Sequence, residues 1–292
     1  MKNVASIIVL YHPSEEVTTL ISSSALNVSN VIVVVNAADE KLLKKIVLIE
    51  KVTILRNNSN VGLAVALNMG ICFAFEKLEA DFVVLFDQDS LPSVGLIEGL
   101  VYEFENSGLQ NLACIGPRLI DVKGLGSSNR RDYSIDTSKA CSIPTSGSVI
   151  SKTAFHAIGP MMDQLFIDGV DHEWCFRAYS KGYVVKVSDY QDMIHDMGDI
   201  GVNYWGQYKP IHRSPIRHYY IIRNTLYLVR LTYVPFSWKL IELTKTVRRI
   251  MAYLVFSSDR LASVRLISFG IYDGLFGRLG ALSKRHLNLV NK

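Results

Sequence analysis

The 292-residue sequence predicts an α/β fold, with a mostly parallel sheet flanked by helices and a basic helical region at the C-terminus. Short β-branched runs alternate with helix-like stretches in the first half of the chain, which is the order expected of a parallel sheet. The charge also changes sign along the chain. Hydrophobic residues make up 49% of the sequence and charged residues 20%, which indicates a globular protein and excludes a disordered one.

Apolar runs predict the strands, and the amphipathic segments between them predict the helices. The strands are expected at residues 4–10, 31–35, 52–55 and 82–86, and the helices around 15–27, 39–47 and 62–77. Ligands of such sheets bind beyond the carboxyl ends of the strands. Polar residues occupy those places here: Asn36, the segment 57–60 and the segment 87–89.

The second half of the chain is less regular. Residues 123–142 are rich in Gly, Ser, Asn, Arg and Asp, which predicts a long loop of the kind that often covers an active site. A helix is expected to begin near Asp171, and a short strand is expected at 183–187. From about Ile216 the sequence predicts long, basic, aromatic helical segments.

Two carboxylates follow the predicted strand 82–86 directly. Asp87 and Asp89 stand two residues apart where the chain turns, so both can reach one cation. Carboxylate oxygens suit Mg²⁺ or Mn²⁺, and such an ion would neutralise a bound diphosphate. The alternative interpretation is that the aspartates cap the next helix or fill a turn.

The run 57–70 combines an Asn-rich turn with a helix of small residues. Ala64, Ala66 and Gly70 would let this helix approach a neighbour or a ligand closely. For this segment alone, an ordinary turn followed by an Ala-rich helix is the favoured interpretation.

Acidic residues gather again between 168 and 177. Asp171 would lie at the exposed start of a helix that Trp174 anchors, and a carboxylate there can accept a proton from an incoming hydroxyl. Arg177 is placed to pair with Glu173. The alternative is a helix cap with a charged first turn.

His195 lies downstream of the last predicted strand. A neutral imidazole can complete an Asp/Asp/His metal site. A lone histidine is more often structural, and that interpretation stays open.

The C-terminal part of the chain is strongly basic. From Gln207 onward there are 15 Lys and Arg against three Asp and Glu, a net charge of +12, whereas the rest of the chain carries −8. An acidic front half disfavours nucleic acid as a partner. The basic, aromatic tail, including Arg223 and Arg230 on one helical face, favours contact with an anionic membrane surface. The alternatives are packing against the rest of the chain or pairing in a homodimer.

Signals for export are weak. The apolar run 4–11 is too short for a signal peptide, and no apolar stretch of about 18 residues predicts a transmembrane helix. The four cysteines form no CxxC pair, which fits a reducing compartment. We therefore expect a cytoplasmic protein, peripheral on the inner face of the plasma membrane.

Taken in order, these motifs resemble family 2 inverting glycosyltransferases of the GT-A fold. The resemblance covers roughly residues 3–230 and includes the NxxNxGxAxAxNxG run from Asn57, Asp87-Gln-Asp, Thr145-Ser-Gly-Ser, Asp171-x-Glu-Trp and the downstream His195. It looks closest to bacterial rhamnosyltransferases of O-antigen or capsule synthesis, with galactofuranosyltransferases as near relatives.

The resemblance implies roles at the matching positions. Asp87 and Asp89 resemble the pair that contacts the nucleotide-sugar and the metal, and Asp171 resembles the catalytic base. His195 resembles the histidine that completes the metal site in the galactofuranosyl relatives. The implied substrate contacts are Asn36, Asp39, Asn60, Asn68, Asp87, Thr145, Ser146, Gly147, Glu173 and Trp174. Many relatives carry a second acid directly before the base, where this chain has Val170.

The implied reaction is transfer of L-rhamnose from dTDP-L-rhamnose to a polyprenyl-diphosphate-linked saccharide. Galactofuranosyl or other hexosyl transfer from a UDP-sugar is the alternative within enzymes, and a catalytically silent assembly scaffold is the alternative of another class. A nucleotidyltransferase is disfavoured because Tyr11-His-Pro-Ser stands where its Gly-rich loop would be. The expected organisation is a catalytic domain at 1–215, with a nucleotide-sugar half to about 110 and an acceptor half from about 111, followed by the helical region 216–292.

Overall fold

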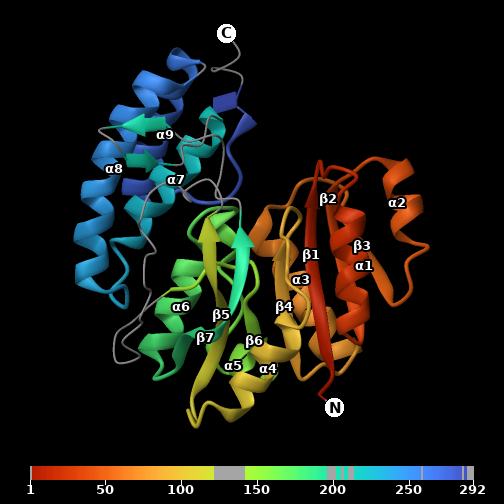
Figure 1. Cartoon of the computed structure of the whole chain (residues 1–292). Helices are drawn as coiled ribbons and strands as arrows, with labels where there is room; N and C mark the ends of the chain where they lie inside the picture. The colour runs from red at the N-terminus through yellow and green to blue at the C-terminus, as the bar shows by residue number, and fades with distance from the viewer. Residues whose placement is uncertain are drawn as a thin grey trace.

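The computed structural model describes residues 2–121, 142–195, 202–204, 207–209, 214–257, 259–284 and 286–287. Almost all of the predicted loop 123–142 therefore lies outside the described residues. A seven-stranded sheet in the order β3-β2-β1-β4-β6-β5-β7 forms the centre of the molecule (Figure 1). Its strands are β1 Val4–Tyr11, β2 Asn30–Ala37, β3 Val52–Arg56, β4 Phe82–Asp87, β5 Leu112–Asp121, β6 Val149–Ser151 and β7 Val184–His195.

The four predicted strands of the first half are confirmed as β1 to β4. They pair in parallel, with β1 between β2 and β4, and only β6 runs antiparallel to its neighbours β4 and β5. Along β1 the side chains alternate between two cores: Ile7 joins the cluster on one face, and Ile8 joins the cluster on the other. The predicted mostly parallel α/β sheet is thus confirmed.

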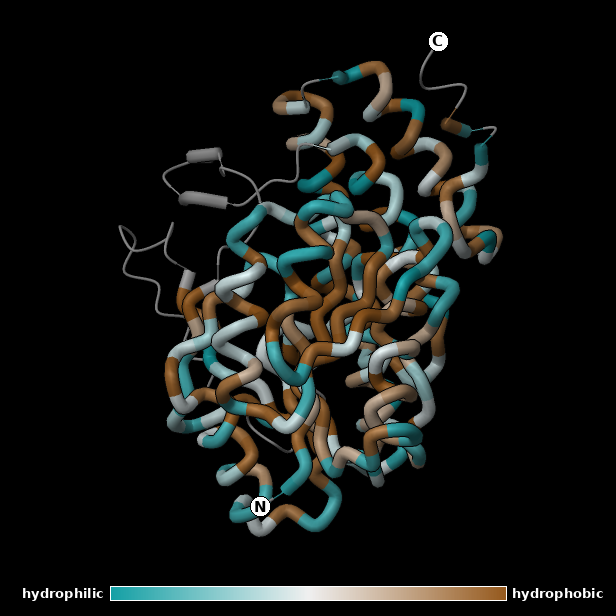
Figure 2. Tube along the Cα trace, turned by 90° about the vertical axis from the view of Figure 1, so that its right-hand side faces the viewer, coloured by the Kyte–Doolittle hydropathy of each residue, from teal (hydrophilic) through white to brown (hydrophobic). Residues whose placement is uncertain are grey.

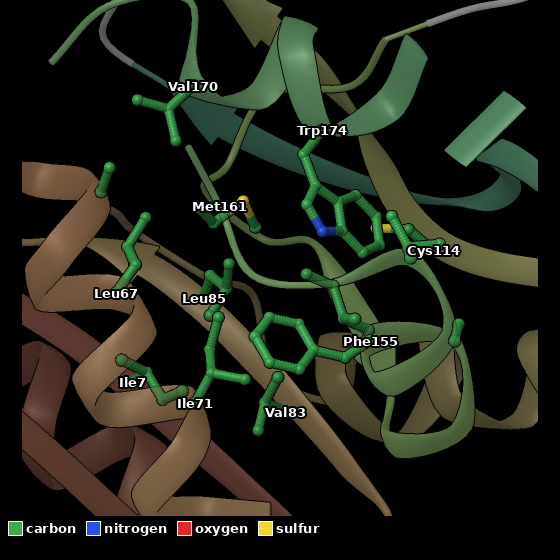
Figure 3. Packing of buried hydrophobic residues seen from close by; sticks show 14 of the residues in the cluster. Ile7, Leu67, Ile71, Val83, Leu85, Cys114, Phe155, Met161, Val170 and Trp174 are labelled. Atoms are coloured by element: carbon green, nitrogen blue, oxygen red, sulfur yellow. The ribbon is translucent and has the colours of Figure 1, made fainter. Parts of the chain in front are cut away.

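Helices cover both faces of the sheet, and Figure 2 shows the hydrophobic strands running through the middle of the molecule. They are α1 Val17–Asn27, α2 Glu40–Ile46, α3 Leu63–Lys77, α4 Leu96–Asn106, α5 Lys152–Ile158 and α6 Val170–Ser180. The predicted close approach of α3 is confirmed at Gly70, where a Cβ atom would lie 2.6 Å from Ile7 Cγ2. Figure 3 shows the core between α3, α5 and α6, with the indole of Trp174 close to Phe155.

The strand predicted at 183–187 is longer in the structure. β7 continues to His195, because its second half pairs with Arg118–Asp121 of β5 after an irregularity in both strands. The polar sequence of residues 188–192 interrupts the apolar pattern, so the continuation carries no periodic signal.

Three helices of the predicted basic region follow the sheet: α7 Pro215–Leu228, α8 Phe236–Phe256 and α9 Arg260–Phe276. They lie together beyond the carboxyl ends of the strands, next to a short hairpin of β8 Val202–Tyr204 and β9 Gln207–Lys209 (Figure 1). Among the described residues, no helix has the length and apolar character needed to span a bilayer.

Arg223 and Arg230 pack within the chain, which is the alternative that the sequence leaves open for them, and the membrane contact of the helical region stays a prediction. Arg223 is fully buried, and Arg230 Nη1 donates to the carbonyl oxygen of Leu275 at 2.7 Å.

Candidate active site

The Asp-Gln-Asp motif lies where β4 ends, and it is fastened to the end of β1. Tyr11 N–H donates to Gln88 Oε1 at 2.8 Å, and Gln88 Nε2 donates back to the Tyr11 carbonyl at 3.2 Å. These bonds fix the turn between the two aspartates. Asp87 is half-buried and Asp89 is exposed, so the turn presents carboxylates at the edge of the sheet where ligands bind.

The predicted loop 145–148 lies directly beside this motif. Gly147 N–H donates to the Leu85 carbonyl at 2.7 Å, and the Ser146 hydroxyl shares a hydrogen bond with the Ser90 hydroxyl. Gly147 has a φ of +82° and no room for a side chain, because a Cβ atom would lie 2.7 Å from Pro117 Cγ. The sequence Thr-Ser-Gly-Ser thus makes a turn that needs glycine and a small hydroxyl.

Asp171 faces the same loop from the other side. It lies in the first turn of α6 and is half-buried, and its Oδ1 accepts from His172 N–H at 2.8 Å. Asp171, Thr145, Ser148 and Leu85 line one small cavity. The loop 145–148 also contacts the end of β4, where Asp87 N–H lies 3.4 Å from the Ser146 hydroxyl. Asp171 and the Asp-Gln-Asp turn thus both lie near this loop, although Asp87 and Asp89 do not line the cavity.

Glu173 and Trp174 are buried. Glu173 is fully buried and accepts from Arg177 Nε at 2.8 Å and from the Tyr233 hydroxyl at 2.6 Å, so the predicted pairing with Arg177 is confirmed. Burial and then the Glu173 carboxylate raise the pKa of Tyr233, which keeps that hydroxyl a donor. Trp174 Nε1 donates to the Gly159 carbonyl at 2.9 Å. Their contact with substrate stays a prediction.

The Asn-rich segment forms a loop beside the ends of β2 and β3. Asn36 is buried, and its Nδ2 donates to the Gly62 carbonyl at 3.1 Å while its Oδ1 accepts from Asn57 Nδ2 at 2.9 Å. Asn60 Oδ1 accepts from Gly62 N–H at 2.9 Å. These asparagines shape the loop at the edge where a nucleotide would lie.

Two other predicted substrate contacts have defined structural partners. Asp39 caps α2, with its Oδ1 accepting from Lys41 N–H at 2.7 Å. Asn68 of α3 is buried and brackets Met161, donating to its carbonyl at 2.9 Å and accepting from its N–H at 2.8 Å. Asn68 therefore ties α3 to the segment that leads toward α6.

The predicted metal ligands are partly within the described structure. His195 is the last residue of β7, and its neighbour Ile194 forms a bridge with Leu91, two residues beyond Asp89. The backbone thus brings the end of β7 alongside the Asp-Gln-Asp turn, but the His195 side chain lies outside the described part. Over the described part, no group of three or more His, Cys, Asp or Glu side chains gathers to hold a metal. The Asp/Asp/His set stays a prediction, and its donor chemistry fits a hard divalent cation.

Sequence reasoning missed the turn that precedes Asp171. Phe166 and Asp168 both have positive φ values, of 67° and 64°, and the Phe166 carbonyl accepts from Leu63 N–H at 2.6 Å. The Asp168-Gly169 pair is a turn signal that marks this position. No local signal reveals that the turn contacts α3.

Comparison with known proteins settles the family. The glycosyl transferase family 2 model matches residues 6–159. The chain belongs to this glycosyltransferase family. It is 30% identical to the dTDP-rhamnosyl transferase RfbF of Shigella flexneri over 292 residues, which cover 95% of this chain and 97% of that protein.

Solved structures agree on the GT-A fold of this glycosyltransferase. Staphylococcus aureus TarS 1–349 in complex with UDP-GlcNAc is similar with a TM-score of 0.54 and 13% identity, covering 93% of this chain and 80% of that one. The crystal structure titled TarS 1–349 gives a TM-score of 0.50 and 12% identity, covering 94% of this chain and 81% of that chain. The predicted family and fold are therefore confirmed.

Proposed function

We propose that this glycosyltransferase transfers L-rhamnose from dTDP-L-rhamnose to a polyprenyl-diphosphate-linked saccharide, with inversion, in the synthesis of a cell-surface polysaccharide such as O-antigen. The observation that supports the reaction type is that the loop 145–148 bonds to the end of β4, next to the Asp-Gln-Asp turn, and also borders the cavity that Asp171 lines. The donor sugar rests on the 30% identity to a dTDP-rhamnosyl transferase along almost the whole chain.

In this proposal one carboxylate is the base. Asp171 accepts the proton of the acceptor hydroxyl as that oxygen bonds to the anomeric carbon, and the bond from that carbon to the dTDP oxygen breaks on the opposite face. The transition state has oxocarbenium character. When bound by Asp87, Asp89 and His195, Mg²⁺ or Mn²⁺ supplies positive charge for the departing diphosphate.

The remaining residues bind the two substrates. Asn36, Asp39, Asn60 and Asn68 belong to the donor side: Asn36 lies near the end of β2, Asp39 follows that strand, and the other two lie in and after the Asn-rich loop. Thr145, Ser146 and Gly147 line the space between donor and acceptor in this proposal, and Glu173 and Trp174 of α6, the helix of the base, are the further substrate contacts.

The C-terminal helices are proposed to rest on the cytoplasmic face of the inner membrane, close to a lipid-linked acceptor. Large apolar side chains lie exposed along the outer sides of α8 and α9, namely Leu240, Val247, Met251, Leu261, Val264 and Leu275. The acids of these helices, Glu242 and Asp273, are buried, whereas Arg248 and Arg260 are exposed. An apolar face edged with arginine suits an anionic leaflet. A homodimer contact is the alternative use of this face.

The division into a catalytic domain 1–215 and a helical region 216–292 is part of the same proposal. The first supplies the donor and acceptor halves, meeting near residue 110, and the second supplies the membrane contact.

A panel of nucleotide-sugars tests which sugar donor the enzyme uses. The full-length protein is expected to release dTDP from dTDP-L-rhamnose in the presence of Mg²⁺ or Mn²⁺ and a lipid-linked acceptor, to stop after EDTA treatment, and to recover when either ion is added back. Release of UDP from a UDP-sugar in place of dTDP would move the protein to the hexosyl or galactofuranosyl alternative. No turnover with any donor would favour the scaffold.

A further inference from the structure

The turn between the 3₁₀ helix Asp163–Leu165 and α6 has an unusual backbone. Phe166, Asp168 and Gly169 have φ values of 67°, 64° and 80°, a region that side-chain-bearing residues rarely occupy. Such conformations persist where the surroundings over-determine them. The turn leads directly into Val170 and Asp171, so its shape fixes where the base lies.

Two side chains of the C-terminal helix α7 donate hydrogen bonds to the carbonyl oxygens of this turn. Asn224 Nδ2 lies 3.0 Å from the carbonyl oxygen of Leu165 and 2.7 Å from those of both Ile167 and Asp168. Arg223 Nη2 donates to the Leu165 carbonyl at 2.8 Å. Both side chains are buried, at 1% and 0% exposed, so water does not compete for these bonds.

The two α7 side chains also hold one another. Arg223 Nε donates to Asn224 Oδ1 at 2.8 Å, and this fixes the amide with its NH₂ group toward the turn. The amide oxygen of Asn224 thus bonds to the Arg223 guanidinium, and its NH₂ group bonds to the backbone of the turn.

The same turn also touches the donor side of the site. The Phe166 carbonyl accepts from Leu63 N–H at 2.6 Å, in the first turn of α3, and the Phe166 ring stacks on Tyr220 of α7 with centroids 5.0 Å apart. Gly62 leaves room for this approach, since a Cβ atom there would lie 2.6 Å from Phe166 Cδ2. The turn therefore joins the helix of the base, the helix after the Asn-rich loop, and α7.

We infer that Asn224, oriented by Arg223, is a positioning residue for glycosyl transfer: it sets the turn 165–168 and through it the position of Asp171 relative to the donor. The inference rests on the proposed function in taking Asp171 as the base. It makes the C-terminal helical region a contributor to the active site as well as a neighbour of it.

Asn224→Ala tests the inference, with Thr246→Val as the matched control. Thr246 is a buried residue of α8 whose hydroxyl donates to the Glu242 carbonyl at 2.7 Å, so the control removes a buried bond of the same helical region away from the turn. We expect Asn224→Ala to lower kcat by about tenfold to a hundredfold, as a small misplacement of a catalytic group does. Thr246→Val should keep the kcat of the folded enzyme.

The affinity for dTDP provides a second readout. The loop 57–62 keeps its own hydrogen bonds to Asn36 in Asn224→Ala, so the Kd of dTDP is expected to stay within about twofold of the parent value. A kcat loss shared equally by both variants, or absent from Asn224→Ala, overturns the inference. If Asn224→Ala fails to fold, Asn224→Ser is measured by the same criteria.

Hydrogen exchange separates this inference from the proposed function. In Asn224→Ala the amides of Leu63 and Glu173, which donate to Phe166 and Gly169, should exchange faster than in Thr246→Val. This measurement needs no substrate, so it tests the positioning role even if dTDP-L-rhamnose proves to be the wrong donor. Unchanged exchange at both amides contradicts the role of Asn224.

Discussion

Asp171 is the residue on which the proposed chemistry depends. Asp171→Asn keeps the size and the acceptor oxygen that His172 N–H uses, but it removes the basic carboxylate. Turnover should fall by about two or more orders of magnitude, the usual contribution of a general base, while dTDP binding stays intact. Glu105→Gln is the control, because Glu105 pairs with Lys2 on the exposed surface at 3.6 Å. Near-normal turnover of Asp171→Asn would remove Asp171 from the role.

At the scale of single residues, the sequence predicts what is local. Asp87, Asp89 and Asp171 can be proposed from their neighbours in the chain, because a buried strand or a helix start determines where each carboxylate points. Asn224 has no such signal, since its partners Leu165, Ile167 and Asp168 lie between 56 and 59 residues away and are bound through their carbonyl oxygens. A side chain that bonds to backbone leaves no trace in the sequence of its partner.

The stability of helix α8 depends on an ion-pair cluster whose carboxylate, Glu242, titrates at acidic pH. Glu242 is buried, and although burial pushes its pKa upward, Arg249 at 2.8 Å and Lys245 at 2.6 Å outweigh that effect and hold the pKa below its ordinary value of 4.5. The folded state thus favours the ionised form. The stability that the cluster contributes is complete above pH 4.5 and is lost as the pH falls through the lowered pKa.

Glu242→Gln should therefore be less stable than the parent at neutral pH and should lose less stability on acidification below pH 4.5. The free energy of unfolding in urea, measured across this range, checks both parts. Glu15→Gln is the control, because Glu15 is 79% exposed in its pair with Lys45 and contributes little. Parallel pH profiles for the parent and Glu242→Gln would contradict the prediction.

The membrane proposal depends on the exposed apolar side chains on the outer sides of α8 and α9. Val247 and Met251 are 64% and 61% exposed and lie four residues apart, so they share one face of α8. Replacing both with glutamate should abolish sedimentation with phosphatidylglycerol vesicles at low salt, because carboxylates are repelled by the anionic surface and cost free energy to bury. Leu26→Glu, on α1 and 82% exposed, is the control and should still sediment.

Two results would contradict the membrane contact. The first is a parent protein that ignores these vesicles. The second is a parent protein that is dimeric in solution and becomes monomeric on the Val247→Glu, Met251→Glu change, which would make the face a subunit interface.

At the scale of the whole molecule, the kind of strand pairing decides whether a strand can be predicted from the sequence. β1, β2 and β4 are parallel and buried on both faces, so each reads as an apolar run bounded by polar residues, and the half-buried β3 continues the parallel sheet at its edge. β6 has three residues and enters the sheet antiparallel between β4 and β5, which no periodicity in so short a segment can indicate. The packing of α7 against the turn before α6 is likewise a tertiary feature.

That packing predicts how the chain responds to truncation at residue 215. Removing the helical region takes away Arg223 and Asn224, which donate hydrogen bonds to the turn 165–168, and it exposes the part of the core that Leu228 covers. Buried carbonyl oxygens without partners cost free energy, and the positive φ values of the turn lose their support. The fragment 1–215 should unfold at a lower temperature than the full chain, as measured by circular dichroism. It should also show no transfer of sugar from the donor. A fragment that melts like the full chain and transfers sugar would make the helices an appendage.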